Sequence, residues 1–365
     1  MKSILILTNN MNGGGAERVL LTLLQNLPRN QYIIDLCLVY WEGALLDELP
    51  HDIHVTALFK KRNAQTAEII RRDNGALYLK AATRRYDVEI AFLEGNAVKI
   101  MSRSSNKNAL KIAWVHVDLS QEHYTSSIFE NTEQEYISFS SFDRILCVSK
   151  AVHDGLEKQL GCGLHSKTVI VYNPIDQVRV QQLAREKEIE KQGVTFCAVG
   201  RLTEQKGFDR LLKVAGCLLA EGFHFEIWIL GEGYLYDKLQ QARRTLHITK
   251  NIIFWGFQKN PYPYIDQANA FISSSRAEGL PMVTGEALIL RTPIIATNCS
   301  RHDEALQHGK YCFLVDNSEN GIYRGMRAFL TGEYTGQELT NSGPQRYAPY
   351  QLKRYIHRIC AILDD

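Results

Sequence analysis

Several features that define other classes of protein are absent from this sequence of 365 residues. No apolar run approaches the roughly 18 residues of a membrane-spanning helix, so any membrane attachment is expected to be peripheral. The eight cysteines are scattered without a Cys-x-x-Cys pair. This spacing argues against structural zinc or a disulfide framework and favours a reducing cytoplasm. The net charge of +2 gives no support to a nucleic-acid partner.

The length indicates two domains, and the pattern of apolar runs indicates their class. Short apolar runs alternate with amphipathic stretches of helix length, as in parallel sheets covered by helices on both faces. The expected strands are Ser3–Leu7, Ile33–Val39, Val88–Phe92, Lys111–Val115, Arg144–Val148 and Thr168–Val171, then Thr195–Val199, Glu226–Leu230, Ile252–Trp255, Ala270–Ile272, Pro293–Ala296 and Cys312–Val315. We therefore expect an α/β protein with two Rossmann-like domains facing a central cleft.

The predicted domain boundary lies at residues 173–176, where Asn-Pro-Ile-Asp precedes a charged segment at 185–191 that resembles a linker. The N-terminal domain is expected to comprise residues 1–175 and the C-terminal domain residues 176–346. A helix-patterned tail at 347–365 is expected to cross back to the N-terminal domain.

A basic stretch runs from Lys60 to Lys111, with a local charge excess of about +7. Apolar residues lie among its basic ones, namely Ile69, Ile70, Leu77, Leu79 and Ala81. The stretch predicts either an amphipathic helix on an anionic membrane or an ordinary solvated helix face.

Two carboxylates, Glu278 and Glu286, flank a loop that opens a helix. Backbone N–H groups at such a helix start attract an anion, and carboxylates on either side can bind the hydroxyls of a sugar-like molecule. The alternative is that Glu278 is a plain loop residue and that Glu286 complements the helix dipole from the first turn.

Other polar residues follow expected strands, where ligands bind in open α/β sheets. Arg201 and Lys206 follow the first strand of the second half and suit a diphosphate. His116 follows a strand of the first half, and a structural role is the alternative to a contact with substrate. Glycine turns lie at similar positions, at Gly13–Gly15, Gly231 and Gly256. These glycines either let a phosphate or a flat ring approach the backbone closely, or serve only to form the turns.

Taken together, these motifs resemble the retaining GT-B glycosyltransferases of family 4, which include bacterial capsule, O-antigen and teichoic-acid enzymes. The resemblance runs nearly end to end. It rests on Gly-Gly-Ala-Glu-Arg at 14–18, Trp-Val-His at 114–116, Val-Ser-Lys at 148–150, Asn-Pro-Ile-Asp at 173–176, Val-Gly-Arg-Leu at 199–202, Lys-Gly at 206–207, Leu-Gly-Glu-Gly at 230–233, Gly256 and the pair Glu278 and Glu286.

The resemblance implies a role for each candidate residue. The first domain would hold the acceptor and the second the nucleotide-sugar donor. Arg201 and Lys206 would bind the donor diphosphate, and Glu286 the ribose hydroxyls. Glu278 and His116 would be the catalytic residues at the donor sugar. The remaining donor-binding residues would be Gly14, Gly15, Gly231, Gly256, Gly279, Leu280, Pro281, Met282 and Val283.

The implied reaction moves a hexose or N-acetylhexosamine from a nucleotide-diphosphate sugar, most simply a UDP-sugar, to a lipid-linked or cell-surface glycan. Neither a cofactor nor a metal is expected, since Arg and Lys can neutralise the diphosphate and no Asp-x-Asp is evident. Retention would proceed by front-side transfer or through a covalent intermediate on Glu278. The expected location is cytoplasmic, at the inner face of the cell membrane.

Two other functions are compatible with the same residues. One is a GT-B sugar-nucleotide epimerase, and the other is a non-catalytic partner in a surface-polysaccharide complex. The sequence departs from the family pattern at Arg291, where a small residue is common, and this side chain would either reach the site or point to solvent.

Overall fold

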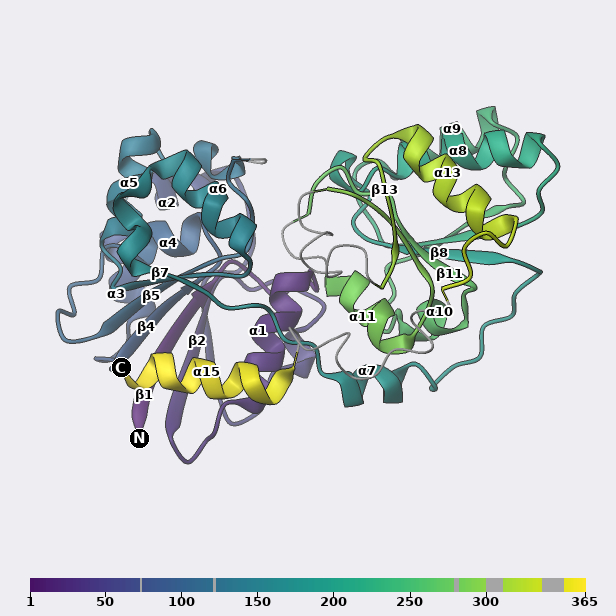
Figure 1. Ribbon diagram of the computed structural model, residues 1–365. Helices are drawn as coiled ribbons and strands as arrows, with labels where there is room; N and C mark the ends of the chain where they lie inside the picture. The colour runs from purple at the N-terminus through teal and green to yellow at the C-terminus, as the bar shows by residue number, and fades with distance from the viewer. Residues whose placement is uncertain (73, 121–122, 279–281, 300–310, 337–350) are drawn as a thin grey trace. The chain divides into compact units, whose positions relative to one another are not determined.

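The computed structural model describes residues 1–72, 74–120, 123–278, 282–299, 311–336 and 351–365. The chain divides into two compact units (Figure 1). Unit 1 comprises Met1–Pro174 and Leu352–Asp365, and unit 2 comprises Ile175–Gln351.

Unit 1 is built on a parallel sheet whose described strands follow the order β3-β2-β1-β4-β5-β6-β7. Helix α1 covers one face of the sheet, and α2 to α6 cover the other (Figure 1). The elements are β1 (Lys2–Thr8), α1 (Gly15–Asn26), β2 (Tyr32–Tyr40), η1 (Leu46–Glu48), β3 (His54–Phe59), α2 (Ala64–Arg72), α3 (Asn74–Ala81), β4 (Val88–Phe92), α4 (Asn96–Met101), β5 (Leu110–Val115), η2 (Tyr124–Ser127), α5 (Thr132–Ser140), β6 (Arg144–Cys147), α6 (Lys150–Leu160), η3 (Cys162–Lys167) and β7 (Thr168–Ile170).

Helix α15 (Leu352–Asp364) completes unit 1, on the same face of the sheet as α1 (Figure 1). Its buried residues Tyr355, Ile359 and Leu363 recur at the spacing of one helix face. The Tyr355 ring lies 6.4 Å from that of Trp114 in β5. Lys2 in β1 donates to the carbonyl of Leu363 at 2.9 Å. The last helix is therefore part of the fold of the first unit.

Unit 2 has a second parallel sheet, whose described strands follow the order β10-β9-β8-β11-β12-β13. Helices α8, α9 and α13 lie on one face, and α7, α10 and α11 lie on the other (Figure 1). The elements are α7 (Gln177–Leu183), β8 (Thr195–Val199), η4 (Glu204–Lys206), α8 (Phe208–Ala220), β9 (Glu226–Leu230), α9 (Tyr236–Thr245), β10 (Ile252–Gly256), α10 (Tyr262–Gln267), β11 (Ala270–Ser273), α11 (Met282–Leu290), β12 (Ile294–Thr297), β13 (Phe313–Val315) and α13 (Glu319–Leu330).

Each expected strand is present, with ends that differ by one residue at most. The sequence prediction missed one strand, β3. The prediction that the charged segment at 185–191 is a linker is wrong. This segment packs on α10 of unit 2. There the Ile189 N–H donates to Gln267 Oε1 at 2.8 Å, and Gln267 donates back to the Lys187 carbonyl at 2.7 Å.

The basic stretch from Lys60 to Lys111 is divided among α2, α3, β4, α4 and β5 rather than forming one surface helix. Of its apolar residues, Ile70, Leu77 and Ala81 are buried in the core, while Ile69 and Leu79 are exposed. None of the described helices is both long and apolar enough to cross a membrane.

Candidate active site

The candidate site of unit 2 lies where β8 and β11 run side by side and their chains then leave in opposite directions. The connection after β8 leads to α8 on one face of the sheet, and the connection after β11 leads to α11 on the other. Ligands bind at such switch points, at the carboxyl ends of the strands. Arg201 and Lys206 follow β8, and Glu278 follows β11, so the structure brings the predicted residues to one edge of the sheet.

Lys206 and Glu278 contact each other directly. The Lys206 ammonium group donates to Oε1 of Glu278 at 2.6 Å, and the Ser275 hydroxyl donates to the same oxygen. The side chains of Lys206 and Glu278 are 18% and 8% exposed, respectively. The two residues were predicted to bind different parts of the donor, but here they form a partly buried ion pair.

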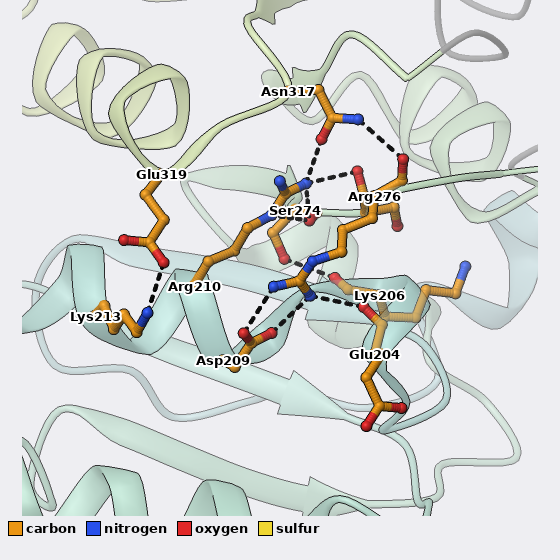
Figure 2. Close-up of polar contacts among 10 residues, drawn as sticks. Glu204, Lys206, Asp209, Arg210, Lys213, Ser274, Arg276, Asn317 and Glu319 are labelled. Atoms are coloured by element: carbon orange, nitrogen blue, oxygen red, sulfur yellow. Dashed lines mark hydrogen bonds and ion pairs between the residues drawn. The ribbon is translucent and has the colours of Figure 1, made fainter.

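A buried arginine holds the loop that leads to Glu278 (Figure 2). The Arg210 guanidinium donates to the Ser274 carbonyl at 2.9 and 2.7 Å, to the Ser275 carbonyl at 2.8 Å and to Asn317 Oδ1 at 2.6 Å. The Thr297 hydroxyl also donates to the Ser275 carbonyl, at 2.6 Å. Burial lowers the pKa of Arg210 from its ordinary value. Backbone carbonyls that would otherwise lack partners are thereby satisfied by one rigid group.

A second arginine joins this loop to the loop after β8 (Figure 2). The Arg276 backbone N–H donates to the Gln205 carbonyl at 2.7 Å, and the Arg276 guanidinium donates to the Glu204 carbonyl at 2.7 Å. The guanidinium also contacts both carboxylate oxygens of Asp209, at 2.8 and 2.7 Å, and these hydrogen bonds lower the pKa of Asp209. The loops that carry Lys206 and Glu278 are therefore held in a fixed position relative to each other.

The Arg201 side chain differs from that of Lys206 in having no partner among the described residues. The residue is exposed, and within the described part of the chain its side chain makes no hydrogen bond or ion pair. Its neighbour Gly200 leaves room for the Lys206 side chain, since an added Cβ there would lie 3.1 Å from Lys206 Cδ and Cε. The Arg201 guanidinium is thus available for an anion.

Two predicted glycines are required by the backbone itself. Gly231 has φ +135°, and an added Cβ would lie 2.0 Å from the Gly200 carbonyl oxygen. The Gly231 N–H donates to the carbonyl of Gly256, which has φ +67°. A side chain would be strained at both positions, with or without a ligand. Their predicted contact with a donor therefore stays a prediction.

Glu286 lies inside α11 and is buried, accepting a hydrogen bond of 3.0 Å from the Tyr262 hydroxyl of α10. It is the fifth residue of the described helix, so the alternative of a first-turn Glu that complements the helix dipole is wrong. Met282 and Val283 begin α11 and are half-buried. The predicted residues Gly279, Leu280 and Pro281 lie outside the described residues.

In unit 1, the predicted residue His116 directly follows β5 and is buried. Its ring lies 4.7 Å from that of Phe92, and neither ring nitrogen has a hydrogen-bond partner among the described residues. Burial lowers the pKa of His116 to about 3, so the imidazole is neutral at physiological pH. A neutral imidazole can donate a hydrogen bond to a sugar or accept one from it. It does not begin the reaction as a protonated general acid.

The His116 backbone leads to a carboxylate that the sequence analysis missed. The His116 N–H donates to Glu94 at 2.8 Å, and the Tyr124 hydroxyl donates to the other oxygen at 2.6 Å. Glu94 is fully buried, which raises its pKa. The remaining predicted glycines of unit 1 are at the start of α1, where Gly14 is the N-cap and Gly15 the first residue.

Three other residues of the site were also missed: Arg210, Arg276 and Tyr262. For Arg210 a signal existed, because it is four residues before Val214 and eight before Leu218, on the face of α8 that the apolar residues mark as buried. For the other two, no spacing rule connects them to partners far along the chain.

Arg291 lies at the end of α11 and is exposed. Its φ of 63° is left-handed, and its N–H donates to the Leu288 carbonyl at 3.2 Å. Helices commonly end in this conformation, usually at glycine. Backbone conformation therefore explains the preference for a small residue at this position.

Two family models match the chain: "Glycosyltransferase Family 4" over residues 13–179 and "Glycosyl transferases group 1" over residues 193–331. The chain is 26% identical over 356 residues to the N-acetylgalactosamine-N,N'-diacetylbacillosaminyl-diphospho-undecaprenol 4-alpha-N-acetylgalactosaminyltransferase of Campylobacter jejuni, covering 95% of each protein. It is 29% identical over 245 residues to an uncharacterized glycosyltransferase of Methanocaldococcus jannaschii, a match that spans 66% of this chain and only 59% of that protein.

Among solved structures, HepE of Anabaena in complex with UDP and glucose is similar over the full length of both chains, with a TM-score of 0.80 at 17% identity. At this identity the similarity concerns the fold alone. It confirms the predicted fold class of two Rossmann-like α/β domains.

Proposed function

Since the chain is a GT-B glycosyltransferase of the group 1 and family 4 type, we propose that it is a retaining, metal-independent transferase that uses a UDP-sugar. The sugar would be a hexose or N-acetylhexosamine, and the acceptor a lipid-linked or cell-surface glycan. One observation carries this proposal: Arg201, Lys206 and Glu278 follow strand ends at the switch point of unit 2, and Glu286 lies on α11, the helix that comes next.

The donor diphosphate would bind next to the cations of the loop after β8. Breaking the bond between sugar and phosphate leaves negative charge on the diphosphate, so fixed cations there lower the barrier. The Arg201 side chain is exposed and has no hydrogen-bond or ion-pair partner among the described residues, which suits this role. Lys206 would either share its ammonium group between phosphate and Glu278 or hold Glu278 in place.

Glu278 would bind the donor sugar, and Glu286 the ribose. A carboxylate that is held by Lys206 and Ser275 is oriented before the substrate arrives, which favours a fixed geometry at the sugar. Glu286 has its Tyr262 partner on one oxygen, which orients the carboxylate for the diol of a ribose. The role of His116 as a contact to the sugar remains part of the proposal.

The choice of UDP and of the acceptor is supported by what similar proteins bind and act on. HepE was solved with UDP and glucose, and the Campylobacter relative acts on a diphospho-undecaprenol glycan. A membrane-linked acceptor would place the protein at the inner face of the membrane, where exposed lysines of the basic stretch would contact anionic lipid.

The test is a transfer assay with purified protein. UDP-, GDP- and ADP-sugars are offered with polyprenyl-diphosphate-linked glycans, and the anomeric configuration of any product is read by NMR. We expect transfer from a UDP-sugar with retained configuration, at the same rate with and without EDTA. The proposal would be overturned by the absence of both transfer and donor hydrolysis across the panel. An inverted product would refute retention, and a new sugar nucleotide formed from donor alone would indicate the epimerase.

A further inference from the structure

A cluster of metal-ligating side chains lies in unit 1, on α6 and η3. His153 and Glu157 are one turn apart on α6, and η3 brings His165 beside them. One ligand atom from each of the three side chains lies within 4.8 Å of the other two. None of the three has a role in the proposed transfer reaction.

The backbone holds His165 in this position. Helix α6 ends at Gly161, whose φ of +90° turns the chain and whose N–H donates to the Glu157 carbonyl at 2.7 Å. The following segment packs closely on α5, since a Cβ added at Gly163 would lie 2.5 Å from the Tyr136 hydroxyl. The return of His165 to Glu157 is therefore built into the fold.

The ring of His153 is oriented as a ligand would be. Its Nδ1 lies 2.9 Å from the Asp154 carboxylate, and its Nε2 lies 3.7 Å from Glu157 Oε1. When Nδ1–H donates to Asp154, Nε2 carries a lone pair that faces a carboxylate oxygen. In this tautomer, a cation between the two electron-rich atoms would be bound by both. Metal-binding histidines commonly donate their other N–H to a carboxylate in this way.

His165 supplies the third ligand. Its Nδ1 contacts the same Glu157 oxygen, and the rings of His153 and His165 are 5.4 Å apart and nearly perpendicular. His153 and Glu157 are partly buried, while the His165 side chain is 69% exposed. The exposed side leaves an open direction from which an ion and a water molecule can enter.

We propose that His153, Glu157 and His165 bind a divalent transition-metal ion of the Zn²⁺ class. Two imidazoles and one carboxylate, with water as a fourth ligand, suit Zn²⁺ rather than Mg²⁺ or Ca²⁺. Tetrahedral Zn²⁺ requires its ligand atoms to be roughly 3.4 Å apart. The ligand atoms now lie within 4.8 Å of one another, and rotation of the exposed His165 side chain can shorten this spacing.

The position of the cluster indicates a structural rather than a catalytic ion. Helix α6 starts after the carboxyl end of β6, and η3 leads into the amino end of β7. Glu157 and His165 thus lie towards the end of α6 that is away from the edge of the sheet where ligands bind, and His153 lies one turn nearer to that edge. A bound ion would cross-link α6 to η3 and stabilise this part of unit 1.

Calorimetric titration of metal-free full-length protein with Zn²⁺, and visible spectroscopy with Co²⁺, test the proposal. We expect one Zn²⁺ per chain, the visible bands of tetrahedral Co²⁺ and a higher thermal midpoint with metal. His153→Ala and His165→Ala should each weaken Zn²⁺ binding by more than about 100-fold, and Asp154→Asn by about 10- to 100-fold. The control His51→Ala removes an exposed histidine of the same unit and should bind Zn²⁺ like the parent.

Failure of the parent to bind Zn²⁺, or equal affinity in His153→Ala, His165→Ala and the parent, would overturn the proposal. The cluster would then consist of histidine–carboxylate ion pairs alone. Thermal midpoints in metal-free buffer establish that each variant is folded, and a variant that is not folded is replaced by Glu157→Gln. Turnover should be the same in metal-free and Zn²⁺-loaded protein, so failure of this proposal leaves the transferase assay unaffected.

Discussion

The Lys206 ammonium nitrogen lies 2.6 Å from Oε1 of Glu278, although 72 positions separate the two residues in the chain. One follows β8 and the other follows β11, so this ion pair joins the two sides of the switch point in unit 2. A diphosphate that approaches Lys206 meets a cation that already has a carboxylate partner. This relationship makes the two residues a coupled unit in which a change at one alters the other.

We expect Lys206→Met and Glu278→Gln to have strongly non-additive effects. Each should lower turnover by roughly 10²–10³-fold, because each removes a fixed charge at the reacting bond. In the unliganded protein, Lys206→Met should lower the free energy of unfolding by about 1–3 kcal/mol, and the double variant should recover part of this loss. Denaturant unfolding of the four proteins measures the coupling. Additive losses would mean that the ion pair contributes nothing to the empty site.

Arg210→Met should disturb the loop before Glu278 without touching the donor. The change removes the donors to the buried carbonyls of Ser274 and Ser275, so the free energy of unfolding should fall by about 2–3 kcal/mol. Lys213→Met is the matched control, because Lys213 is on the same helix and forms an exposed ion pair with Glu319. The midpoint of urea unfolding should be the same in this control as in the parent. Equal midpoints for both variants would show that Arg210 does not hold the loop.

The free energy of unfolding should fall in acid because of His116. The His116 pKa is about 3 in the folded protein, against an ordinary 6.5, so the unfolded chain binds one more proton between these values. The stabilisation is complete above about pH 6.5 and is lost at about 1.4 kcal/mol per unit as the pH falls towards 3. The free energy of unfolding of His116→Gln lacks this dependence. Since Glu94 is present in both proteins, the difference between their pH profiles isolates the imidazole. Parallel profiles would contradict a neutral buried His116.

Arg291→Gly should stabilise the protein. A left-handed conformation costs an L-residue roughly 1–2 kcal/mol, and the gain is reduced by the greater freedom of glycine in the unfolded chain. We expect an increase of about 0.5–1 kcal/mol in the free energy of unfolding, measured by urea denaturation. Arg291→Ala has the same backbone constraint and should stay within about 0.5 kcal/mol of the parent. A gain in the alanine variant as well would place the cause in the side chain.

Binding to anionic vesicles should depend on Lys60 and Lys61, which are exposed. Arg84 is a poor choice for this test because it pairs with Asp35, and Arg71 and Arg72 both pair with Glu68. Lys60→Ser with Lys61→Ser should weaken binding by roughly 30-fold at low salt, at about 1 kcal/mol per charge.

Vesicle flotation measures this loss. The control, Lys238→Ser with Arg244→Ser, removes the same charge from exposed positions of α9 in unit 2 and should bind like the parent. A loss of binding in both variants would reflect net charge rather than a surface.

The sequence predicted strands well where they are buried on both faces. Val88–Phe92 and Thr195–Val199 have the predicted ends, because short runs of mostly apolar residues leave few alternatives. The edge strand β3, His54–Phe59, was missed because its residues are mostly half-exposed and carry no such run. Its place in the sheet comes from pairing with β2.

The candidate site was predicted in its residues but not in its contacts. Strand ends in a parallel sheet meet at one edge, so Arg201, Lys206 and Glu278 could be brought together from the sequence alone. The direct pairing of Lys206 with Glu278 could not be predicted from the sequence, because it depends on how two loops fold. The burial of His116 could not be predicted either, because its ring packs against Phe92 of the neighbouring strand β4 and Trp114 of β5.

Helix α15 gives unit 1 an unusual order of synthesis. The residues that complete this unit, Leu352–Asp364, leave the ribosome only after all of unit 2. At 5–20 residues per second, unit 1 waits on the order of ten seconds or more for its last helix. During that interval the sheet face that receives Tyr355, Ile359 and Leu363 lacks its cover, and unit 2 can fold first. A nascent chain stalled before residue 352 should therefore carry a folded second unit and an incomplete first one.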